Sequence, residues 1–579
     1  MKKIFLIISL LFAVTNLMAE PIGEKRAREI ATEFLSQKMT RATISNLQLE
    51  WAGSNINGVT RASNNTDDSL MYIYNSAESK SFVIVGGDTN ADFVLAYSLN
   101  NTFDMENMAD GAKAILSAWC RQIEDARKKN TPININRHST RANNAILYQT
   151  ANWDQGEPYN RETPIINGQR SATGCAATAM AIICHYNKWP NNGVGTTPEY
   201  TYTDSYDNQT HTIPANELGH TYDYDNMLMS YEGNYTQAQG DAIAALMKDM
   251  GTSVEMKYHP KGSAAYDMNV ATALSKYFGY SKKTSVVYGS NYSYDEWTDT
   301  LRENLSTYGP TLFNGVSYDG GGHAFVLDGF DEMDRFHFNY GWSGIDNGYY
   351  HLPSAEYYAQ QSAILYLTPD REGASQYSDN LTLLYSDCPG IYTGLTSYSQ
   401  GVEIYCAYGN IMNVGATTFN GYIKLVLCDK QGNWKQELIT KYLYLGQQSV
   451  DNIQYATFTL TDPLSVGDRI RLYYKGEYSS DWQWARGYSA DVVDELILIA
   501  SPEDIANYLT LKYDKSNEVL SLLNKLAMKI DIYYHYDDYL GASDETTALQ
   551  PYSIKIPSGD TYRIELSLGG EPYKLILKL

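Results

Sequence analysis

The sequence has few basic residues, few cysteines and no long apolar run beyond residue 20. Its 44 Lys and Arg are outnumbered by 67 Asp and Glu, which gives a formal net charge of −23 at pH 7. A basic face for nucleic acid or for an anionic membrane surface is therefore not expected. Because no later segment is long and apolar enough to cross a bilayer, we also expect no transmembrane span.

Cysteine is scarce, which excludes a disulfide-stabilised fold. Six cysteines in 579 residues are too few for one. Cys388, Cys406 and Cys428 lie near one another in the sequence, so one bridge among them is compatible with the spacing. CxxC and HExxH motifs and clustered histidines are missing as well, and these are the usual signatures of metal sites. We therefore expect no metal site.

What the chain does contain indicates a folded protein of several domains. Hydrophobic residues make up 43% of the chain, which is typical of folded proteins. Its length suits about three or four domains. The 51 tyrosines favour β-rich extracellular modules over helical bundles.

The first 19 residues have the layout of a secretory signal peptide. Lys2 and Lys3 precede an apolar stretch over residues 4–14, and Ala19 is a small residue at the expected cut. The apolar stretch is too short to span a membrane well. We predict cleavage after about Ala19 and export to the periplasm, the cell surface or the medium.

Residues 20–141 look like a separate α+β domain. Helical spacing covers residues 24–38 and 108–128, and strand-like runs cover residues 71–74 and 81–85. The polar, Arg-rich stretch that follows has no periodicity, which is typical of a linker exposed to proteases.

Residues 142–369 carry the candidate chemistry, and the pattern changes beyond them. Short alternating strands separated by turns fill the rest of the chain, which predicts β-sandwich modules. We place one module at residues 370–500 and a β-rich module at 501–579, with the break near Ser501-Pro502.

Cys175 has the sequence context of a reactive thiol. It follows Gly174 and opens a run of small, helix-favouring residues, so we predict that it begins a helix. The positive end of the helix dipole and the unpaired N–H groups there favour the thiolate form. On this context alone a buried structural cysteine is equally compatible, because free cysteine is commonly buried.

His323 is the best-placed general base. Three glycines precede it, a strand is predicted directly after it, and a second strand is predicted at residues 335–340. Antiparallel pairing of the two strands would place His323 opposite Asn339 or Tyr340, with Cβ atoms about 5 Å apart. Asn339 would then orient the imidazole and Trp342 would shield it from water. The alternative is a structural histidine in a core or a turn.

Two other histidines are weaker candidates for the base. His185 lies ten residues along the same predicted helix as Cys175, which is roughly 15 Å away. His337 shares a strand face with Asn339 but lacks the glycines that let a substrate backbone approach. We interpret His337 as a hydrogen-bonded strand histidine.

Gln155 is a candidate for stabilising the transition state. Its side-chain amide, together with the Cys175 backbone N–H, would form an oxyanion hole for acyl transfer. By itself this residue is weak support, because glutamine is common in loops.

Four segments of the chain resemble the sequence blocks of streptopain-type cysteine peptidases, which are papain-like proteases secreted by bacteria. These segments are residues 153–160, 173–179, 321–328 and 339–344. The resemblance runs through the whole of residues 142–369. It continues into the leader, where residues 81–88 and 94–98 resemble the inhibitory pro-domain of that family.

The resemblance assigns a role to each candidate residue. It implies Cys175 as the nucleophile, His323 as the base, Gln155 as the oxyanion donor, Asn339 as the orienting amide, Trp342 as the neighbouring aromatic, and Ser263, Gly322 and Tyr340 as cleft residues. It also implies a papain-like α+β fold and catalysis without a cofactor.

The match has two departures. Asn339-Tyr340-Gly341-Trp342 stands where the family usually has Asn-Trp-Gly-Trp, and Ala176 follows the cysteine where the family commonly has Val. Tyr340 keeps an aromatic side chain but adds a hydroxyl, so the substrate specificity of the family does not carry over to this chain.

We therefore predict a secreted cysteine endopeptidase that acts on proteins or peptides and is made as a zymogen. Residues 20–141 would occupy the cleft and inhibit the enzyme within the same chain. One alternative is a non-catalytic adhesin or binding protein. Another is a transpeptidase or deamidase that uses the same acyl-enzyme step.

A short repeat indicates where the precursor is cut. Thr-Arg-Ala occurs three times in the leader, around Arg41, Arg61 and Arg141. Chance accounts equally well for the first two copies. The third copy lies where the pro-domain ends, so we predict cleavage within a few residues of Arg141.

Overall fold

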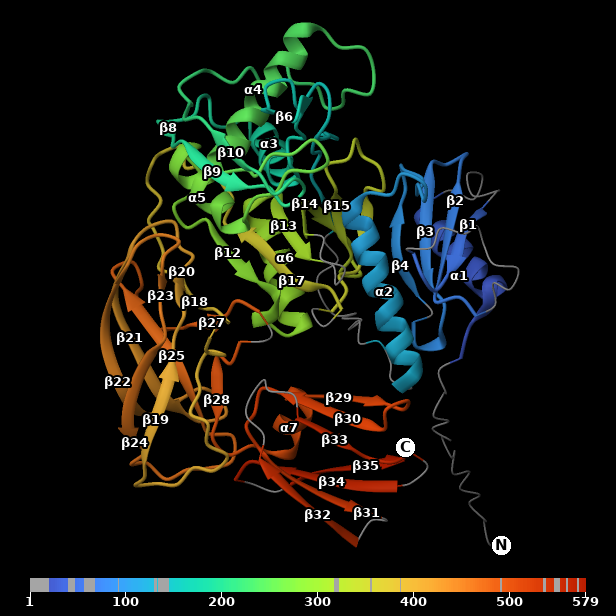
Figure 1. Ribbon diagram of the computed structural model, residues 1–579. Coiled ribbons are helices and arrows are strands. Elements are labelled where there is room, and N and C mark those ends of the chain that lie inside the picture. Colours follow the sequence, from blue (N-terminus) through green and yellow to red (C-terminus); the bar gives the residue numbers. More distant parts are fainter. Residues whose placement is uncertain are drawn as a thin grey trace, which may run out of the picture. The chain divides into compact units, whose positions relative to one another are not determined.

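Figure 1 shows the computed structural model of the protein. It describes residues 20–39, 47–56, 68–91, 93–129, 133, 145–316, 322–354, 357–385, 387–489, 492–534, 538–545, 552–558, 561–569 and 572–578. The predicted signal peptide, including Ala19, and the three Thr-Arg-Ala segments lie outside the described residues. The chain divides into two compact units, and each unit is described by itself.

The first unit contains the leader and His323. It comprises Met1–Tyr148, Val316–His323 and Leu327–Ala359. Its strands follow the order β1-β2-β3-β4-β16-β15-β14, and β5 pairs with β14. The strand bounds are β1 Gln48–Gly53, β2 Met71–Ser76, β3 Ser81–Gly86, β4 Val94–Ser98, β5 Ile146–Leu147, β14 Gly322–Phe330, β15 Phe336–Asn339 and β16 Gly348–Tyr350. The predicted leader strands are confirmed as β2 and β3, and the two strands around His323 as β14 and β15.

Leader strand β4 pairs with β16, which lies 250 residues later in the chain. Tyr349 lies opposite Tyr97, and Tyr350 lies opposite Ala96, in an antiparallel ladder. The rings of Tyr97 and Tyr349 stack with their centroids 5.0 Å apart. The leader strands and the strand that carries His323 therefore belong to one sheet.

Two leader helices accompany these strands. Helix α1 (Gly23–Lys38) buries Ala27, Ala31 and Leu35, which recur every four residues and pack on the leader sheet (Figure 1). Helix α2 (Asp110–Lys129) follows β4, and the 3-10 turn η2 (Thr89–Ala91) precedes it. Both helices match the helical spacing of the sequence.

The second unit contains the helix that begins at Cys175. It comprises Gln149–Gly315, Ala324–Val326 and Gln360–Leu579. Helix α3 (Cys175–Asn187) is buried over residues 176–185 and belongs to the largest apolar core of this unit. Its run of small side chains lets neighbouring segments approach closely. The other helices are α4 Gln237–Ser253, α5 Asp267–Tyr277, α6 Tyr294–Tyr308 and the 3-10 turn η3 Gly289–Asn291.

Along the sequence, strands precede, separate and follow these helices. β17 lies between β13 and β12 in the sheet. The remaining strands form three two-stranded pairs, β6 with β7, β8 with β11 and β9 with β10. The bounds are β6 Ile165–Ile166, β7 Gln169–Arg170, β8 Thr196–Thr197, β9 Tyr200–Thr203, β10 Thr210–Ile213, β11 Asn216–Glu217, β12 Ser285–Tyr288, β13 Thr311–Val316 and β17 Ala359–Leu365.

Residues beyond 380 form β-sheets, as the alternating pattern predicts. The sheets are β23-β20-β18-β27, β19-β24 and β22-β21-β25-β26, with β28 paired to β25. Side chains of all three sheets, among them Leu381, Ile404 and Leu425, share one apolar core. The bounds are β18 Leu381–Leu383, β19 Glu403–Tyr408, β20 Ile411–Asn413, β21 Phe419–Cys428, β22 Trp434–Leu445, β23 Val450–Asp451, β24 Gln454–Thr459, β25 Arg469–Gly476, β26 Gln483–Trp484, β27 Arg486–Gly487 and β28 Glu495–Ile497.

The last β-rich segment begins at a capped helix. Ser501 caps helix α7 (Pro502–Tyr508) in a capping box with Asp504, and Pro502 occupies the first helical turn. Two sheets, β29-β30-β33 and β32-β31-β34-β35, follow the helix and share a second core. The bounds are β29 Leu509–Asp514, β30 Val519–Asn524, β31 Lys529–Tyr534, β32 Asp538–Glu545, β33 Tyr552–Lys555, β34 Thr561–Ser567 and β35 Tyr573–Lys578.

All six cysteines are described, and each is a free thiol. The bridge that the spacing of Cys388, Cys406 and Cys428 allowed is therefore absent. Among the described helices, none combines the length and the apolar character that crossing a membrane requires.

Candidate active site

Cys175 is the first residue of helix α3, as its sequence context predicts. Its side chain is partly exposed, whereas the nine following helix residues, from Ala176 to Cys184, are buried. The first N–H groups of a helix have no intrahelical acceptor and carry the positive end of the helix dipole. A thiolate at this position is therefore stabilised by the helix itself.

Gly174 shapes the backbone just before the thiol. Its φ of 89° lies in the region that favours glycine. A Cβ added there would lie 2.6 Å from Met256 Sδ and 3.2 Å from Ser263 Cβ. The conformation therefore favours glycine at this position, and an added Cβ would also displace the Met256 side chain.

Cys175 differs from the other thiols of the chain in its exposure. The other five cysteines are buried. Burial raises the pKa of Cys120, of Cys184 and of Cys406 to about 12, and it also raises the pKa of Cys388 and of Cys428. Those five thiols stay protonated and inert at neutral pH, so Cys175 is the one available nucleophile among the cysteines.

The Gln155 loop is tied to the segment that leads into α3. The Gln155 backbone carbonyl accepts a hydrogen bond from the Thr173 N–H at 3.1 Å. Trp153, which is fully buried, anchors the loop by donating from Nε1 to the Leu228 carbonyl at 2.8 Å. Gln155 itself is half-buried. These contacts tie the backbone of Gln155 to Thr173, which lies two residues before Cys175 in the sequence.

Ser263 belongs to the same neighbourhood as Gly174 and is buried. Its Oγ accepts a hydrogen bond from the His259 N–H at 3.0 Å and donates to the Ala172 carbonyl at 2.8 Å. The hydroxyl thus joins the His259–Ser263 turn to the segment before Cys175. The role of Ser263 in the substrate cleft stays a prediction.

His323 lies at the second position of β14 and is 8% exposed. Its Nε2 lies 3.3 Å from Trp342 Nε1 and 3.3 Å from the Tyr340 carbonyl oxygen. An indole N–H only donates, so the contact with Trp342 requires a lone pair on Nε2. The contact with the carbonyl requires an N–H there instead. The neutral tautomer with its proton on Nδ1 can therefore accept from Trp342, whereas the neutral tautomer with its proton on Nε2, like the imidazolium, can donate to Tyr340.

The neighbours of His323 in the Asn339–Trp342 segment are held by their own bonds. Asn339 Oδ1 accepts from the Gly341 N–H at 3.2 Å, and the Tyr340 N–H donates to Asn347 Oδ1 at 3.0 Å. The Tyr340 side chain is fully buried, and Trp342 is half-buried. Gly322, which precedes His323, is exposed. The orienting role of Asn339 and the cleft roles of Gly322 and Tyr340 stay predictions.

The two weaker histidine candidates are engaged elsewhere. His337 Nδ1 lies 2.5 Å from Asp328 Oδ1, so His337 is the hydrogen-bonded strand histidine that we expected. His185 lies in the last turns of α3 with its ring 4.8 Å from that of Trp153, and burial lowers its pKa. His185 thus packs in the core as a neutral side chain.

Leader helix α2 lies directly against the His323 ring. A Cβ added at Gly111, in the first turn of α2, would lie 2.6 Å from Tyr340 Cδ1 and 3.1 Å from His323 Cδ2. The helix backbone therefore approaches both rings as closely as glycine permits. In the precursor, the face of His323 that meets α2 is covered by the leader.

Comparison with known proteins identifies both parts of the precursor. The family model of the peptidase C10 family matches residues 153–350, and that of the Spi protease inhibitor matches residues 19–123. Streptopain of Streptococcus pyogenes serotype M28 (strain MGAS6180) is 32% identical over 358 residues, which are 57% of this chain and 84% of the relative. This chain belongs to the peptidase C10 family. It is a cysteine peptidase of papain-like α+β fold with an inhibitor-like pro-domain.

Other relatives of this C10 peptidase extend the comparison. The thiol protease/hemagglutinin PrtT of Porphyromonas gingivalis is 30% identical over 61% of this chain and 41% of the relative. A structure of a Prevotella intermedia prointerpain A fragment is 28% identical, covers 56% of this chain and 99% of that chain, and has a TM-score of 0.47. Active interpain A from the same organism is 33% identical over 39% of this chain and 95% of that chain, with a TM-score of 0.35.

Asp346 of the C10 peptidase holds the start of helix α2. Its two carboxylate oxygens accept hydrogen bonds from the Asp104 and Ala109 N–H groups, each at 2.9 Å. Ala109 directly precedes the helix, so the carboxylate faces the positive end of the helix dipole. Burial outweighs these donors and raises the pKa of Asp346 to about 7.

A second set of contacts joins the leader of this C10 peptidase to the turn between β14 and β15. Arg335 donates from Nε to Asp331 Oδ2 at 2.8 Å and from Nη1 to the Val94 carbonyl at 3.3 Å. Its guanidinium lies over the rings of Phe34 and Tyr97, 4.9 Å from each centroid. A buried cation of the peptidase segment is thus enclosed by leader residues.

The sequence did not identify Gly111, Asp346 or Arg335 as functional residues. Gly111 is one of 43 glycines, and Asp346 lies in a turn with no motif. Each acts through a contact with a segment more than 200 residues away, and a local pattern carries no signal for such a contact.

Proposed function

We propose that this C10 peptidase is a secreted endopeptidase made as a zymogen, with Cys175 as the nucleophile and His323 as the general base. The observation that carries the proposal is the position of Cys175: it is the one cysteine that is not buried, and it begins helix α3 after a glycine with a φ of 89°. A thiolate there is both stabilised and accessible.

The chemistry follows from these two groups. The Cys175 thiolate attacks the carbonyl carbon of the scissile peptide, and the carbonyl electron pair moves to oxygen to give a tetrahedral oxyanion. Collapse of this intermediate breaks the C–N bond, while the His323 imidazolium gives its proton to the departing amine. Water, deprotonated by neutral His323, then attacks the thioester and releases the acid and the thiolate.

The hydrogen-bond partners of His323 support this role. The Tyr340 carbonyl lies 3.3 Å from Nε2, so an N–H on Nε2 has an acceptor whether the ring is neutral or charged. In that neutral tautomer Nδ1 carries no proton and can take one up. We assign Nδ1 as the nitrogen that exchanges its proton with Cys175 and with the leaving amine. Asn339 and Trp342 keep the ring in place in this scheme.

We assign the oxyanion hole to the Gln155 side-chain amide and the Cys175 backbone N–H. The Gln155 backbone is tied to Thr173, two residues before the thiol, which supports a fixed position for the side chain. Loss of one donor of this kind costs about 10²–10³-fold in kcat. Gln155→Ala should therefore lower kcat by about that factor.

In this proposal the leader, residues 20–141, inhibits the peptidase. Its helix α2 covers His323 and Tyr340 at Gly111, and Asp346 and Arg335 hold the neighbouring leader backbone. Removal of the leader uncovers both rings. We propose that export follows signal-peptide cleavage after about Ala19 and that maturation follows cleavage within a few residues of Arg141.

The test of the proposed chemistry is alkylation by a peptidyl epoxide, with the labelled peptide mapped by mass spectrometry. The mature enzyme should take up one label, on Cys175, in parallel with the loss of activity. Cys184→Ala, which removes a buried thiol of the same helix, should label equally. Inactivation with the label on another residue would contradict the assignment.

N-terminal sequencing of the active form tests the maturation site. We expect a start near residue 142, and a start before about residue 130 or after Trp153 would contradict it. A purified Cys175→Ala precursor shows whether the enzyme cuts itself, because this variant matures only if another protease makes the cut.

A further inference from the structure

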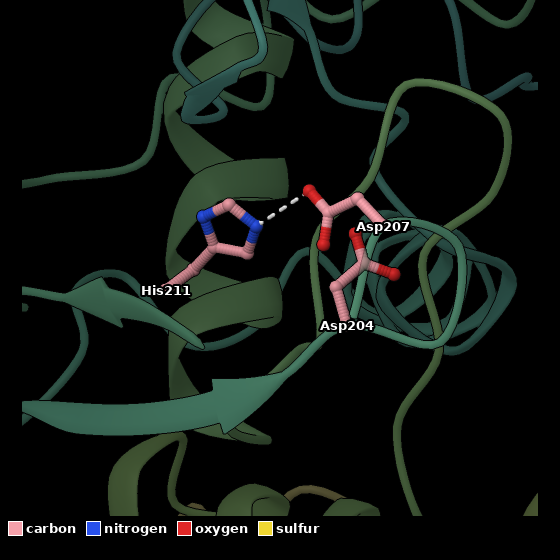
Figure 2. A group of neighbouring side chains, drawn as sticks. All are labelled: Asp204, Asp207 and His211. Carbon is pink, nitrogen blue, oxygen red and sulfur yellow. Dashed lines mark hydrogen bonds and ion pairs between the residues drawn. The ribbon is translucent and has the colours of Figure 1, made fainter. Parts of the chain in front are cut away.

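The hairpin of β9 and β10 brings together three ligand-type side chains that the proposed peptidase chemistry does not use. Asp204 and Asp207 lie in the connecting loop, and His211 lies on β10 (Figure 2). One carboxylate oxygen of each aspartate and one ring nitrogen of His211 all lie within 4.8 Å of one another. His211 Nε2 is 3.0 Å from Asp207 Oδ2. Figure 2 shows the Asp204 carboxylate directed toward that of Asp207.

The three side chains are largely shielded from water. The exposed fraction is 4% for the side chain of Asp204 and 15% for those of Asp207 and His211. Two carboxylates that face each other in such a place repel, and desolvation adds to the cost of their charge. The arrangement therefore needs a compensating positive charge.

Asp204 has an oxygen with no partner. Its Oδ1 accepts from the Tyr206 N–H at 2.9 Å. Its Oδ2 is fully buried and accepts no hydrogen bond from any residue that the structure describes. A buried carboxylate oxygen without a donor is rare in a folded protein and calls for a ligand that the protein itself does not supply.

His259, the basic residue beside Asp204, does not fill that role. His259 Nε2 lies 3.9 Å from Asp204 Oδ2, which is too long for a hydrogen bond. His259 Nδ1 accepts a hydrogen bond from the Lys261 N–H. Within the described part of the chain, no lysine or arginine pairs with Asp204 or Asp207.

Asp207 is held in a fixed orientation. Its Oδ2 accepts from Asn167 Nδ2 at 2.8 Å, and its Oδ1 accepts from the Gln209 N–H at 2.7 Å. Outer partners of this kind orient the carboxylates of metal sites.

We propose that Asp204, Asp207 and His211 bind a zinc ion, with Asp204 Oδ2, an Asp207 oxygen and His211 Nε2 as its ligands. Three protein ligands and a water complete the four positions that zinc prefers. The imidazole favours zinc over calcium or magnesium, which take oxygen ligands. The site differs from the expectation of no metal because its spacing, Asp-x2-Asp-x3-His, matches none of the motifs that we sought in the sequence.

The ion would brace the turn that supports Cys175. Tyr206, in the same loop, stacks on His259 with the ring centroids 4.4 Å apart and an angle of 15°. His259 in turn donates its backbone N–H to Ser263 Oγ, and Ser263 supports the segment before Cys175. Binding of an ion by this loop therefore stabilises the hairpin next to the His259–Ser263 turn. This structural role is independent of the proposed peptidase chemistry.

The test measures zinc binding by the full-length, tag-free precursor carrying Cys175→Ala, which removes the exposed thiolate as a competing ligand. We expect one equivalent of zinc after equilibrium dialysis against micromolar Zn²⁺, measured by elemental mass spectrometry. We also expect zinc to raise the melting temperature of this protein. Less than half an equivalent, or one equivalent without any change in the melting temperature, would overturn the proposal.

Two variants in the same background locate the ion. Asp204→Asn and His211→Gln should each weaken zinc binding by at least about 100-fold, since loss of an outer partner alone costs about 10- to 100-fold. His220→Gln is the matched control: His220 Nε2 lies 3.3 Å from Asp249 Oδ2, outside the cluster, so this variant should keep the zinc.

Folding of the variants is checked without metal. Asp204→Asn removes a buried, uncompensated charge, so its metal-free melting temperature should equal or exceed that of the parent. Its zinc-induced shift should vanish. Unchanged zinc binding in both Asp204→Asn and His211→Gln would overturn the proposal, as would tighter binding of Ca²⁺ than of Zn²⁺.

Discussion

At the scale of single residues, Cys175 differs from the other cysteines in its position in the fold. The thiol is partly exposed, begins a helix, and follows a glycine whose backbone lies in the left-handed region. The other cysteines have raised thiol pKa values because they are buried. Exposure thus separates the proposed nucleophile from the buried thiols.

The first prediction concerns Gly174. Gly174→Ala places a methyl group 2.6 Å from Met256 Sδ on a backbone with φ of 89°. The strain and the overpacking should lower the free energy of unfolding by about 1–3 kcal/mol. Activity should fall as well, because the start of α3 must shift. Chemical denaturation and peptide hydrolysis measure the two effects.

Gly219→Ala is the control for this prediction. An added Cβ at Gly219 meets no atom within 4 Å, and its backbone lies outside the left-handed region. This variant should therefore match the wild type in both measurements. Equal stability of Gly174→Ala and Gly219→Ala would show that Gly174 is not required.

At the scale of residues, the sequence predicted the structural features that depend only on residues close together in the chain. The glycine, the thiol and the small residues of α3 are adjacent, so the helix start at Cys175 could be inferred from them. The strands of His323 and Asn339 could be inferred from their alternation and the turn between them. The hydrogen bond from Trp342 to His323 could not, because it depends on how the segment after β15 turns back.

At the scale of elements, the pro-domain acts through a sheet and a helix. β4 pairs with β16, which places leader residues next to the strand system of His323. Helix α2 then approaches the His323 and Tyr340 rings at Gly111. The sequence predicted each leader element but not this pairing, because strand order between distant segments leaves no local pattern.

The second prediction concerns the closest point of that helix. Gly111→Ala adds a methyl group where Tyr340 Cδ1 would lie 2.6 Å away. Overpacking of about 1–3 kcal/mol should raise the inhibition constant of the leader, added as a separate chain, by about 5- to 150-fold. The inhibition of peptide hydrolysis by the mature enzyme measures this constant.

Lys113→Ala provides the comparison, since Lys113 is an exposed residue on the same turn of α2. Its inhibition constant should equal that of the unmodified leader. If Gly111→Ala inhibited as well as Lys113→Ala, the contact between α2 and His323 would not contribute to inhibition.

The third prediction concerns pH and Asp346. Its pKa is raised from 3.8 to about 7 in the precursor, first because it is buried. Leader residues lie against this carboxyl, so release of the leader should expose it to water and return the pKa toward 3.8. A raised pKa means that the bound state holds the proton more tightly. The leader should therefore bind more tightly as pH falls, by about tenfold between pH 8 and pH 6.

Binding of the leader to a mature Cys175→Ala enzyme, measured by calorimetry at pH 8 and pH 6, checks this sign. Asp346→Asn removes the titrating group, so the affinity of this variant for the leader should lack the tenfold change between pH 8 and pH 6. A leader affinity that falls with acidity in the wild type, or an identical pH dependence in Asp346→Asn, would contradict the role of Asp346.

At the scale of the whole molecule, the chain combines a catalytic segment, an inhibitor-like leader and β-modules. The family match covers residues 153–350, and the inhibitor match covers residues 19–123. The sequence pattern separated these segments, and the resemblance to streptopain-type peptidases assigned the catalytic part and the inhibitor-like leader. The contacts between the two could not be predicted, because they join segments more than 200 residues apart, as Asp346 with Ala109.

The central claim is that Cys175 carries out the chemistry with His323 as its base. The most direct measurement compares hydrolysis of casein and of a peptide by purified mature wild type, Cys175→Ala, His323→Ala and Cys184→Ala. We expect kcat to fall at least about 10⁴-fold in Cys175→Ala and nearly as far in His323→Ala, because neither group acts without the other. Cys184→Ala should keep the activity, since that buried thiol takes no part. Substantial casein hydrolysis by Cys175→Ala would contradict the account.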